Sequence, residues 1–208
     1  LEQVGKTQII ALDKTGTITT GIMQVTDVIP TNGESTVSLL EIATALEAKS
    51  EHPISKAITK YAAEKSITVK ETKDFETVSG NGLTAVYENT KVFGGNAAYI
   101  SKCIGNISSE VNTKLTALSK EGKTPVIFAK IDKVLGIIAV ADQIKEDSAK
   151  AISQLKNMGI HVIMLTGDNQ ITAKAIAEKA GVDEVVAGVK PDGKEAIIRQ
   201  LMKSGKVA

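Results

Sequence analysis

The sequence has little cysteine and no excess of charge of either sign, and each shortage excludes a class of protein. Its 208 residues include one cysteine, Cys103, so it can form neither an internal disulfide nor a cluster of thiolate metal ligands. We expect Cys103 to be a small residue near a helix end, in a reducing, cytosolic setting. The charges, 25 Lys+Arg against 24 Asp+Glu, provide no basic excess, and we therefore expect no nucleic-acid partner.

Long apolar runs are also missing. The longest run, 134–141, is far shorter than the roughly 18 residues that a membrane-spanning helix needs. No signal segment opens the chain, and there is neither an internal repeat nor a low-complexity segment. The chain begins at Leu1 without Met, and 205–208 has the pattern of a starting strand, so we expect both ends to be cut from a longer protein.

The two ends of the chain have the pattern of a parallel α/β sheet. The β-rich segment 7–12 ends directly at Asp13, which places Asp13 at the carboxyl end of a strand. After Asp142, helices alternate with strands, a rhythm typical of a parallel sheet wrapped by helices. The expected helices are 147–158, 170–180 and 193–203, and the expected strands are 160–165 and 185–187.

The middle of the chain has a different pattern. A helix with Leu39, Ile42 and Leu46 on one face precedes a second helix that begins at Pro53. Strands are then expected at 83–87, 91–94, 126–131 and 134–140, with a polar helix at 109–120. Segment 27–33 is expected to break the strand pattern before this module. The sequence thus predicts a Rossmann-like parallel domain, 1–27 plus 141–208, with an inserted α+β module, 28–140, built on an antiparallel sheet.

The most informative stretch for chemistry is 13–19. An aspartate at the carboxyl end of a parallel strand faces the crevice where such sheets bind ligands. Its carboxylate can attack phosphorus and form an acyl phosphate, while Lys14, the backbone N–H groups and the hydroxyls of the following loop can stabilise a transferring phosphoryl group. The alternative is a strand that simply ends in a polar turn.

A second strand end offers similar groups. Thr166-Gly167-Asp168 follows the apolar strand, and two such strand ends can converge on one phosphate. Lys194, near the start of the last helix, could reach a phosphate as a point charge. A turn before a helix N-cap and an exposed surface lysine are the respective alternatives.

In the inserted module, the candidate binding residues are less diagnostic. Glu47 ends one helix, and Ser-Glu-His-Pro at 50–53 starts the next. The glycine clusters 80–82 and 94–96 permit a ligand to approach the backbone closely. The chain has no Walker lysine motif and no G-x-G-x-x-G after a strand. His52 could instead be a helix N-cap, and the glycines could be turns.

These motifs, in this order, resemble the catalytic part of P-type ATPases. Asp-Lys-Thr-Gly-Thr at 13–17 resembles their phosphorylation signature, and Thr-Gly-Asp at 166–168 their phosphate motif. Ser-Glu-His-Pro at 50–53 resembles the nucleotide-domain signature of the heavy-metal branch. The resemblance covers the whole chain, and 141–148 and 173–177 look more like copper pumps than zinc or cadmium pumps.

The resemblance implies a role for each matching residue. Asp13 would be phosphorylated by ATP, Lys14 would neutralise phosphate, and Asp13 with the Thr15 carbonyl would bind Mg²⁺. The remaining phosphate-site residues would be Thr166, Gly167, Asp168 and Lys194. The adenine end of ATP would be held by Glu47, His52, Gly80, Gly82, Gly95 and Asn96. The chain would be a monomeric fragment on the cytoplasmic side of a membrane pump, working with transmembrane and actuator domains that it lacks.

The chain departs from the family pattern at its end. The family's glycine- and aspartate-rich motif, which includes a second Mg²⁺-binding carboxylate, would follow residue 208, so we expect a phosphorylation domain truncated at its C-terminus. The runner-up interpretation is a soluble phosphatase of the haloacid-dehalogenase-like superfamily. Such enzymes usually carry an acid two residues after the nucleophile, where this sequence has Thr15. A nucleotide-binding module without enzyme activity is a third interpretation, which leaves Asp13 unexplained.

Overall fold

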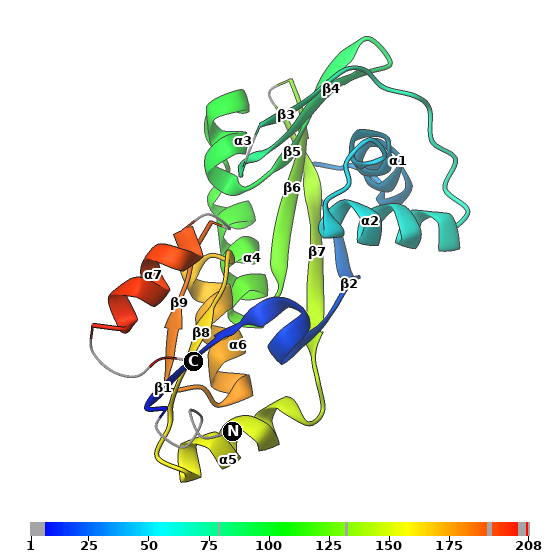
Figure 1. Cartoon of the computed structure of the whole chain (residues 1–208). Helices are drawn as coiled ribbons and strands as arrows, with labels where there is room; N and C mark the ends of the chain where they lie inside the picture. The colour runs from blue at the N-terminus through cyan, green and yellow to red at the C-terminus, as the bar shows by residue number, and fades with distance from the viewer. Residues whose placement is uncertain (1–6, 79, 132, 191–192, 204–206, 208) are drawn as a thin grey trace. The chain divides into compact units, whose positions relative to one another are not determined.

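The chain divides into two compact units. The computed structural model (Figure 1) describes residues 7–78, 80–131, 133–190, 193–203 and 207. One unit comprises Leu1–Ile22, Ser119–Gly122 and Asp142–Ala208, and the other comprises Met23–Leu118 and Lys123–Ala141. Two long strands, β2 (Thr19–Pro30) and β7 (Lys133–Ile144), belong partly to each unit. The domain limits 1–27, 28–140 and 141–208 stay a prediction.

The first unit is built on a parallel sheet in the order β1-β8-β9. β1 (Ile9–Asp13) pairs with β8 (His161–Leu165) so that Asp13 lies opposite Leu165, and β8 pairs with β9 (Glu184–Val186). The carboxyl ends of β1 and β8 therefore reach the same edge of the sheet. This register brings the two polar segments that follow these strands together, as the sequence predicted.

Three helices accompany this sheet: α5 (Ser148–Asn157), α6 (Gln170–Ala180) and α7 (Lys194–Leu201). Alternate residues of β8, Val162 and Met164, are buried against Ile152 of α5 and Ile176 of α6 in one apolar core. The ends of α6 follow from its sequence. The Asn169 side chain accepts hydrogen bonds from the backbone N–H groups of Ile171 and Thr172, and Gly181 ends the helix with φ 79°.

The second unit contains a six-stranded sheet in the order β2-β7-β6-β5-β4-β3. The strands from β3 to β7 pair antiparallel with their neighbours, as expected for the inserted module. The remaining strands of the sheet are β3 (Lys73–Val78), β4 (Gly82–Tyr87), β5 (Thr90–Gly95) and β6 (Thr124–Lys130).

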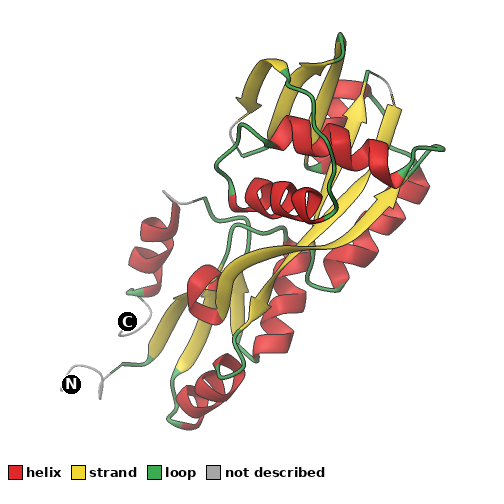
Figure 2. Ribbon diagram, turned by 90° about the vertical axis from the view of Figure 1, so that its right-hand side faces the viewer, coloured by secondary structure: helices red, strands yellow, loops and turns green. Residues whose placement is uncertain are grey.

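Helices cover both faces of this sheet (Figure 2). α1 (Thr36–Glu47) and α2 (Pro53–Glu64) pack on one face, and α3 (Ala97–Ile104) and α4 (Ser109–Lys120) pack on the other. Along β6, Val126 and Phe128 enter the first core, while Ile127 and Ala129 enter the second. Burial on both faces explains why the central strands β6 and β7 contain continuous apolar runs instead of alternating apolar and polar residues.

The fold class predicted from the sequence is confirmed, but three local expectations were wrong or incomplete. Segment 27–33 breaks the strand pattern later than expected, because β2 continues to Pro30 and the turn follows at 32–33. The sequence analysis did not identify β3, whose side chains are mostly exposed, or the short helix α3. The expected strand at 205–208 lies largely outside the described residues, although Val207 forms a parallel bridge to Ile9.

Within the described residues, no helix is both long enough and apolar enough to cross a membrane.

Candidate functional site

Asp13 lies at the end of β1, where the chain leaves the sheet into a single wide turn, η2 (Lys14–Ile18). Within this turn Gly16 has φ 77°, a backbone conformation that favours glycine. The Lys194 ammonium at the start of α7 lies 2.8 Å from Asp13 Oδ2, and the Asp13 side chain remains 44% exposed. Asp13 is therefore a solvent-accessible carboxylate with a cation beside it.

The neighbouring residue Lys14 is held in a buried ion pair. Its Nζ lies 2.7 Å from Asp168 Oδ2, and the two side chains are only 5% and 11% exposed. The buried Thr166 hydroxyl donates to the same Asp168 oxygen over 3.0 Å. These contacts join the segments after β1 and β8 and bring together the predicted residues Lys14, Thr166 and Asp168.

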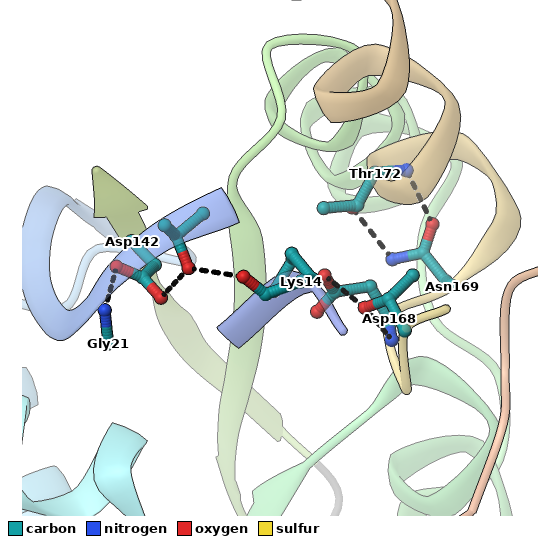
Figure 3. A network of polar contacts seen from close by, with 8 residues as sticks. Lys14, Gly21, Asp142, Asp168, Asn169 and Thr172 are labelled. Carbon is teal, nitrogen blue, oxygen red and sulfur yellow. Dashed lines mark hydrogen bonds and ion pairs between the residues drawn. The ribbon is translucent and has the colours of Figure 1, made fainter. Parts of the chain in front are cut away.

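Asp142, near the end of β7, anchors the turn after Asp13 (Figure 3). Asp142 Oδ2 lies 2.6 Å from the Thr19 hydroxyl, which also lies 2.9 Å from the Lys14 carbonyl oxygen, and Asp142 Oδ1 accepts from the Gly21 N–H. Sequence reasoning did not identify Asp142 or Thr19 as site residues. Both lie in the motifs that it quoted, but only the folded chain brings residues 123 positions apart into contact.

Two further contacts fix the same turn. Lys145 Nζ donates to the Gly16 carbonyl over 2.7 Å, and the Ser148 hydroxyl donates to the Ile18 carbonyl over 2.8 Å. Because these carbonyls are already engaged, the turn is held in one conformation from both ends. Backbone groups that are fixed in advance can stabilise developing charge without reorganising during a reaction.

In the second unit, Glu47 is a buried carboxyl at the end of α1. It is 4% exposed, and its Oε2 accepts a hydrogen bond of 2.5 Å from the Ser55 hydroxyl on α2. Burial raises the pKa of Glu47 to about 7, and the Ser55 hydrogen bond opposes part of that rise. Glu47 therefore changes charge near neutral pH.

His52 is the N-cap of α2. Its Nδ1 accepts a hydrogen bond of 3.2 Å from the Ile54 N–H, so the cap interpretation considered from the sequence is correct. Desolvation lowers the pKa of His52 and favours the neutral ring. In a neutral ring whose Nδ1 is an acceptor, the proton is on Nε2. The cap thus leaves Nε2–H as a donor for a ligand, and the two roles of His52 are compatible.

The predicted glycines of this unit have different reasons to be glycine. Gly82 and Gly95 are paired across β4 and β5. A Cβ on Gly82 would lie 2.2 Å from the Gly94 carbonyl oxygen, and one on Gly95 would lie 2.5 Å from the Asn81 carbonyl oxygen. Close packing therefore accounts for both residues. Gly80 has space for a Cβ, but its φ of 71° favours glycine.

Asn96 is the N-cap of α3. Its side chain accepts a hydrogen bond of 2.9 Å from the Tyr99 N–H. Gly94, two residues earlier, lies against the α1 side chain that precedes Glu47, since a Cβ there would be 2.9 Å from Leu46 Cδ2. The β5 glycine segment and the end of α1 are thus neighbours in this unit.

The groups available for Mg²⁺ are few. The described residues contain no group of three or more Asp, Glu, His or Cys side chains placed to hold a metal. Asp13 offers one accessible carboxylate, and Thr15, with ψ 122° in the following turn, offers a carbonyl nearby. This donor set fits Mg²⁺, which usually binds one or two carboxylates and keeps water and phosphate as its other ligands. It does not form a complete site by itself.

Comparison with known proteins identifies a family. The model of the haloacid dehalogenase-like hydrolases matches residues 7–208. Among curated relatives, a copper-exporting P-type ATPase of Staphylococcus aureus (strain MRSA252) is 41% identical over 206 residues, which are 99% of this chain. A silver exporting P-type ATPase of Salmonella typhimurium is 38% identical over 210 residues, covering 100% of this chain. The chain spans 25% of the length of each relative.

Solved structures lead to the same group of proteins. A zinc-transporting PIB-type ATPase in its E2.Pi state superposes with a TM-score of 0.68 at 32% identity, covering 99% of this chain and 33% of that one. The catalytic domain of the CPx-ATPase CopB-B has a TM-score of 0.71 at 26% identity, covering 99% of this chain and 71% of that one. That structure is described in terms of conformational changes in the catalytic domain upon nucleotide binding.

The anchoring role of Asp142 can be tested by stability. Replacing Asp142 with Ala leaves the Thr19 hydroxyl and the Gly21 N–H without their carboxylate acceptor, so we expect the free energy of unfolding to fall by about 2–3 kcal/mol. The matched control is Asp147→Ala, because Asp147 makes no side-chain cap bond to α5. Urea denaturation of both variants measures the difference, and equal losses would contradict the anchoring role.

The buried carboxyl of Glu47 predicts a dependence of stability on pH. The pKa of Glu47 is 4.5 in the unfolded chain and about 7 in the folded protein, so the folded protein binds the Glu47 proton more tightly. The contribution of this proton to the free energy of unfolding is therefore fully present below pH 4.5 and is lost as pH rises through 7. The loss corresponds to about 3 kcal/mol. Unfolding free energies of wild type and Glu47→Gln at pH 4.5 and 8 measure it. We expect the unfolding free energy of wild type to fall between pH 4.5 and 8 relative to that of the variant. An equal change in the two proteins would contradict this prediction.

Proposed function

Because this chain belongs to the haloacid dehalogenase-like hydrolase family and matches heavy-metal P-type ATPases along its whole length, we propose that it is the ATP-hydrolysing unit of a pump that exports copper. Its phosphorylation domain would be 1–27 plus 141–208, and its nucleotide-binding domain 28–140. The pump would carry its own transmembrane and actuator domains, with this unit on the cytoplasmic side of the membrane.

The observation that carries the proposal is the arrangement around Asp13. An accessible carboxylate ends β1, a cation lies 2.8 Å away, and the next residue is fixed by a buried ion pair. In the proposed reaction an Asp13 oxygen attacks the γ-phosphorus of ATP, the bond to the bridging oxygen breaks, and ADP leaves. Lys194 then pairs with the phosphoryl oxygens instead of with Asp13. Later attack by water releases phosphate and restores the carboxylate.

Lys14 and its partners would define the phosphate site. The buried pair with Asp168 holds Lys14 in place, and Thr166 and Gly167 complete the second strand end. Mg²⁺ would be held by Asp13 and the Thr15 carbonyl, and it would supply neutralisation of charge on the phosphate oxygens. The rigid turn from Lys14 to Ile18 keeps these groups oriented.

The adenine end of ATP would be bound in the second unit. Glu47 offers a carboxylate acceptor, and His52 offers an Nε2–H donor, which are complementary to the edge of an adenine ring. Gly80, Gly82, Gly95 and Asn96 would line the same site.

Copper is the proposed cargo because the curated relatives at 38–42% identity are named as copper and silver exporters, whereas the zinc transporter is 32% identical. A soluble phosphatase is disfavoured by Thr15. Phosphatases of this superfamily usually carry an acid two residues after the nucleophile to activate water, and a threonine there favours a longer-lived acyl phosphate. Such a lifetime suits a pump that changes conformation between phosphorylation and hydrolysis.

The first prediction of this proposal concerns Asp13. In the full-length pump, Asp13→Asn removes the nucleophile, so labelling of the protein by γ-³²P-ATP should be lost while ATP affinity stays within about twofold. Acid-quenched gels measure the label, and isothermal titration measures the affinity. Asp147→Asn, which alters a carboxylate without a cap bond, is the control and should label normally. Persistent acid-stable label in Asp13→Asn would exclude Asp13 as the nucleophile.

The second prediction separates the two roles of His52. Replacing it with Ala should cost roughly 1 kcal/mol of stability through the lost cap and should weaken ATP binding about tenfold through the lost donor. The matched control is Ser35→Ala, because Ser35 caps α1 in the same unit by accepting from the Ser38 N–H. It should cost similar stability but leave affinity unchanged. Equal affinities in the two variants would mean that His52 only caps.

A further inference from the structure

A chain of hydrogen bonds connects the end of α1 with the turn that begins α2. The Ser55 hydroxyl donates to Glu47 Oε2 and also lies 2.8 Å from the Ser50 hydroxyl. Ser50 Oγ in turn accepts a hydrogen bond of 3.3 Å from the His52 N–H. Ser55 is 1% exposed, so water does not compete for its contacts. The Glu47 side chain is thereby linked through two serines to the backbone N–H of His52, the other residue proposed to bind adenine.

When Glu47 is ionised, each hydroxyl in this chain has a defined direction. A serine hydroxyl carries one proton, and the Ser55 proton goes to the Glu47 carboxylate. The contact between the two serines is then made by the Ser50 proton, and the Ser50 oxygen remains an acceptor for the His52 N–H. With Glu47 ionised, every proton in the chain therefore points toward its carboxylate, and each serine both donates and accepts one hydrogen bond.

We propose that Ser55 is a positioning residue that holds the Glu47 carboxylate, in its ionised form and in one orientation relative to the His52 turn, for an amino group of a bound adenine. The inference rests on the proposed function, since it assumes that Glu47 and His52 bind the base. Ser55 itself, buried behind Glu47, does not need to touch the nucleotide. Its contribution is to keep one carboxylate oxygen occupied so that the other is presented to the ligand.

The neighbouring polar groups are engaged in contacts of their own, so we assign the positioning of the Glu47 carboxylate to Ser55. In the turn after α1, the Lys49 ammonium donates to the Thr72 carbonyl, and before α2 the Glu51 carboxylate pairs with Lys56. His52 uses Nδ1 for its cap. The sheet brings apolar side chains toward this helix pair, among them Leu83, Ala85 and Phe128.

No charged neighbour contributes to the shift in the pKa of Glu47. Burial raises the pKa to about 7, and the Ser55 hydrogen bond is the one interaction that lowers it. Removal of the hydroxyl should therefore raise the pKa of Glu47 further, and fewer molecules would have an ionised acceptor at pH 7.

The test is the pH profile of ATP binding, measured by isothermal titration from pH 6 to 9 without Mg²⁺. For wild type, affinity should rise through about pH 7 as Glu47 ionises. For Ser55→Ala, the midpoint should move upward by about one pH unit, so that affinity is about fivefold weaker at pH 7 and within about twofold of wild type at pH 9. The titration of Glu47, followed by its ¹³C carboxyl signal without nucleotide, should move in the same direction.

The matched control is Thr59→Ala. Thr59 lies one turn later on α2, and its hydroxyl donates to the Ser55 and Lys56 carbonyls and not to Glu47. Any titration of ATP itself affects the control equally, so it cancels in the ratio of affinities. If Ser55→Ala does not fold, Ser55→Cys keeps the volume with a much weaker donor and should show the same upward shift.

The outcomes separate the inference from the function on which it rests. An unshifted midpoint in Ser55→Ala, or a loss of affinity by the same factor at every pH, would overturn the positioning role, since a packing defect has no reason to follow the ionisation of Glu47. Failure of wild type to bind ATP, or unchanged binding in Glu47→Gln, would instead overturn the proposed adenine site. A shifted midpoint with weakened Glu47→Gln binding supports both.

Discussion

The ion pair between Lys14 and Asp168 is the interaction on which the proposed phosphate site depends. It joins residues 154 positions apart, at 2.7 Å, with both side chains almost fully buried. Such a pair adds little net stability, because desolvation offsets most of the attraction, but removal of either partner leaves an uncompensated buried charge that costs about 3–5 kcal/mol. The pair therefore acts mainly as a constraint, which holds the turn after β1 against the turn after β8.

Around this constraint the chain places groups with different degrees of exposure. Lys14 and Thr166 are buried and fixed, whereas Asp13 and Lys194 remain partly open to solvent. A nucleophile must be reached by its substrate, while the groups that orient it gain from being rigid. In the second unit the arrangement is reversed, since the buried Glu47 is the proposed ligand. Burial raises the pKa of Glu47, and the Ser55 hydroxyl opposes part of that rise, which makes its protonation sensitive to a small change nearby.

Much of the fold was predictable from local patterns. The apolar strand before Asp13, the helical spacing after Pro53 and the alternation after Asp142 led to the correct class for both sheets. The errors have physical causes. β3 has few buried side chains, so it lacks the apolar pattern by which a strand is recognised, and Pro30 at the end of β2 resembles a loop signal although the strand continues to it. The roles of the predicted site residues remain predictions.

The sequence by itself led to the proposed type of chemistry, because the order of acidic, basic and hydroxyl residues after apolar strands can be seen from local spacing. It also indicated most of the helices, although not the short α3, since periodicity and capping residues act over a few positions. Tertiary structure alone decided which of these groups meet. Asp142 meets Thr19, Lys194 meets Asp13, and Ser55 meets Glu47 through packing of elements that are separate in sequence. Tertiary structure also decided the ionisation of Glu47, because the burial that raises its pKa is produced by the whole unit and by no residue beside it in the chain.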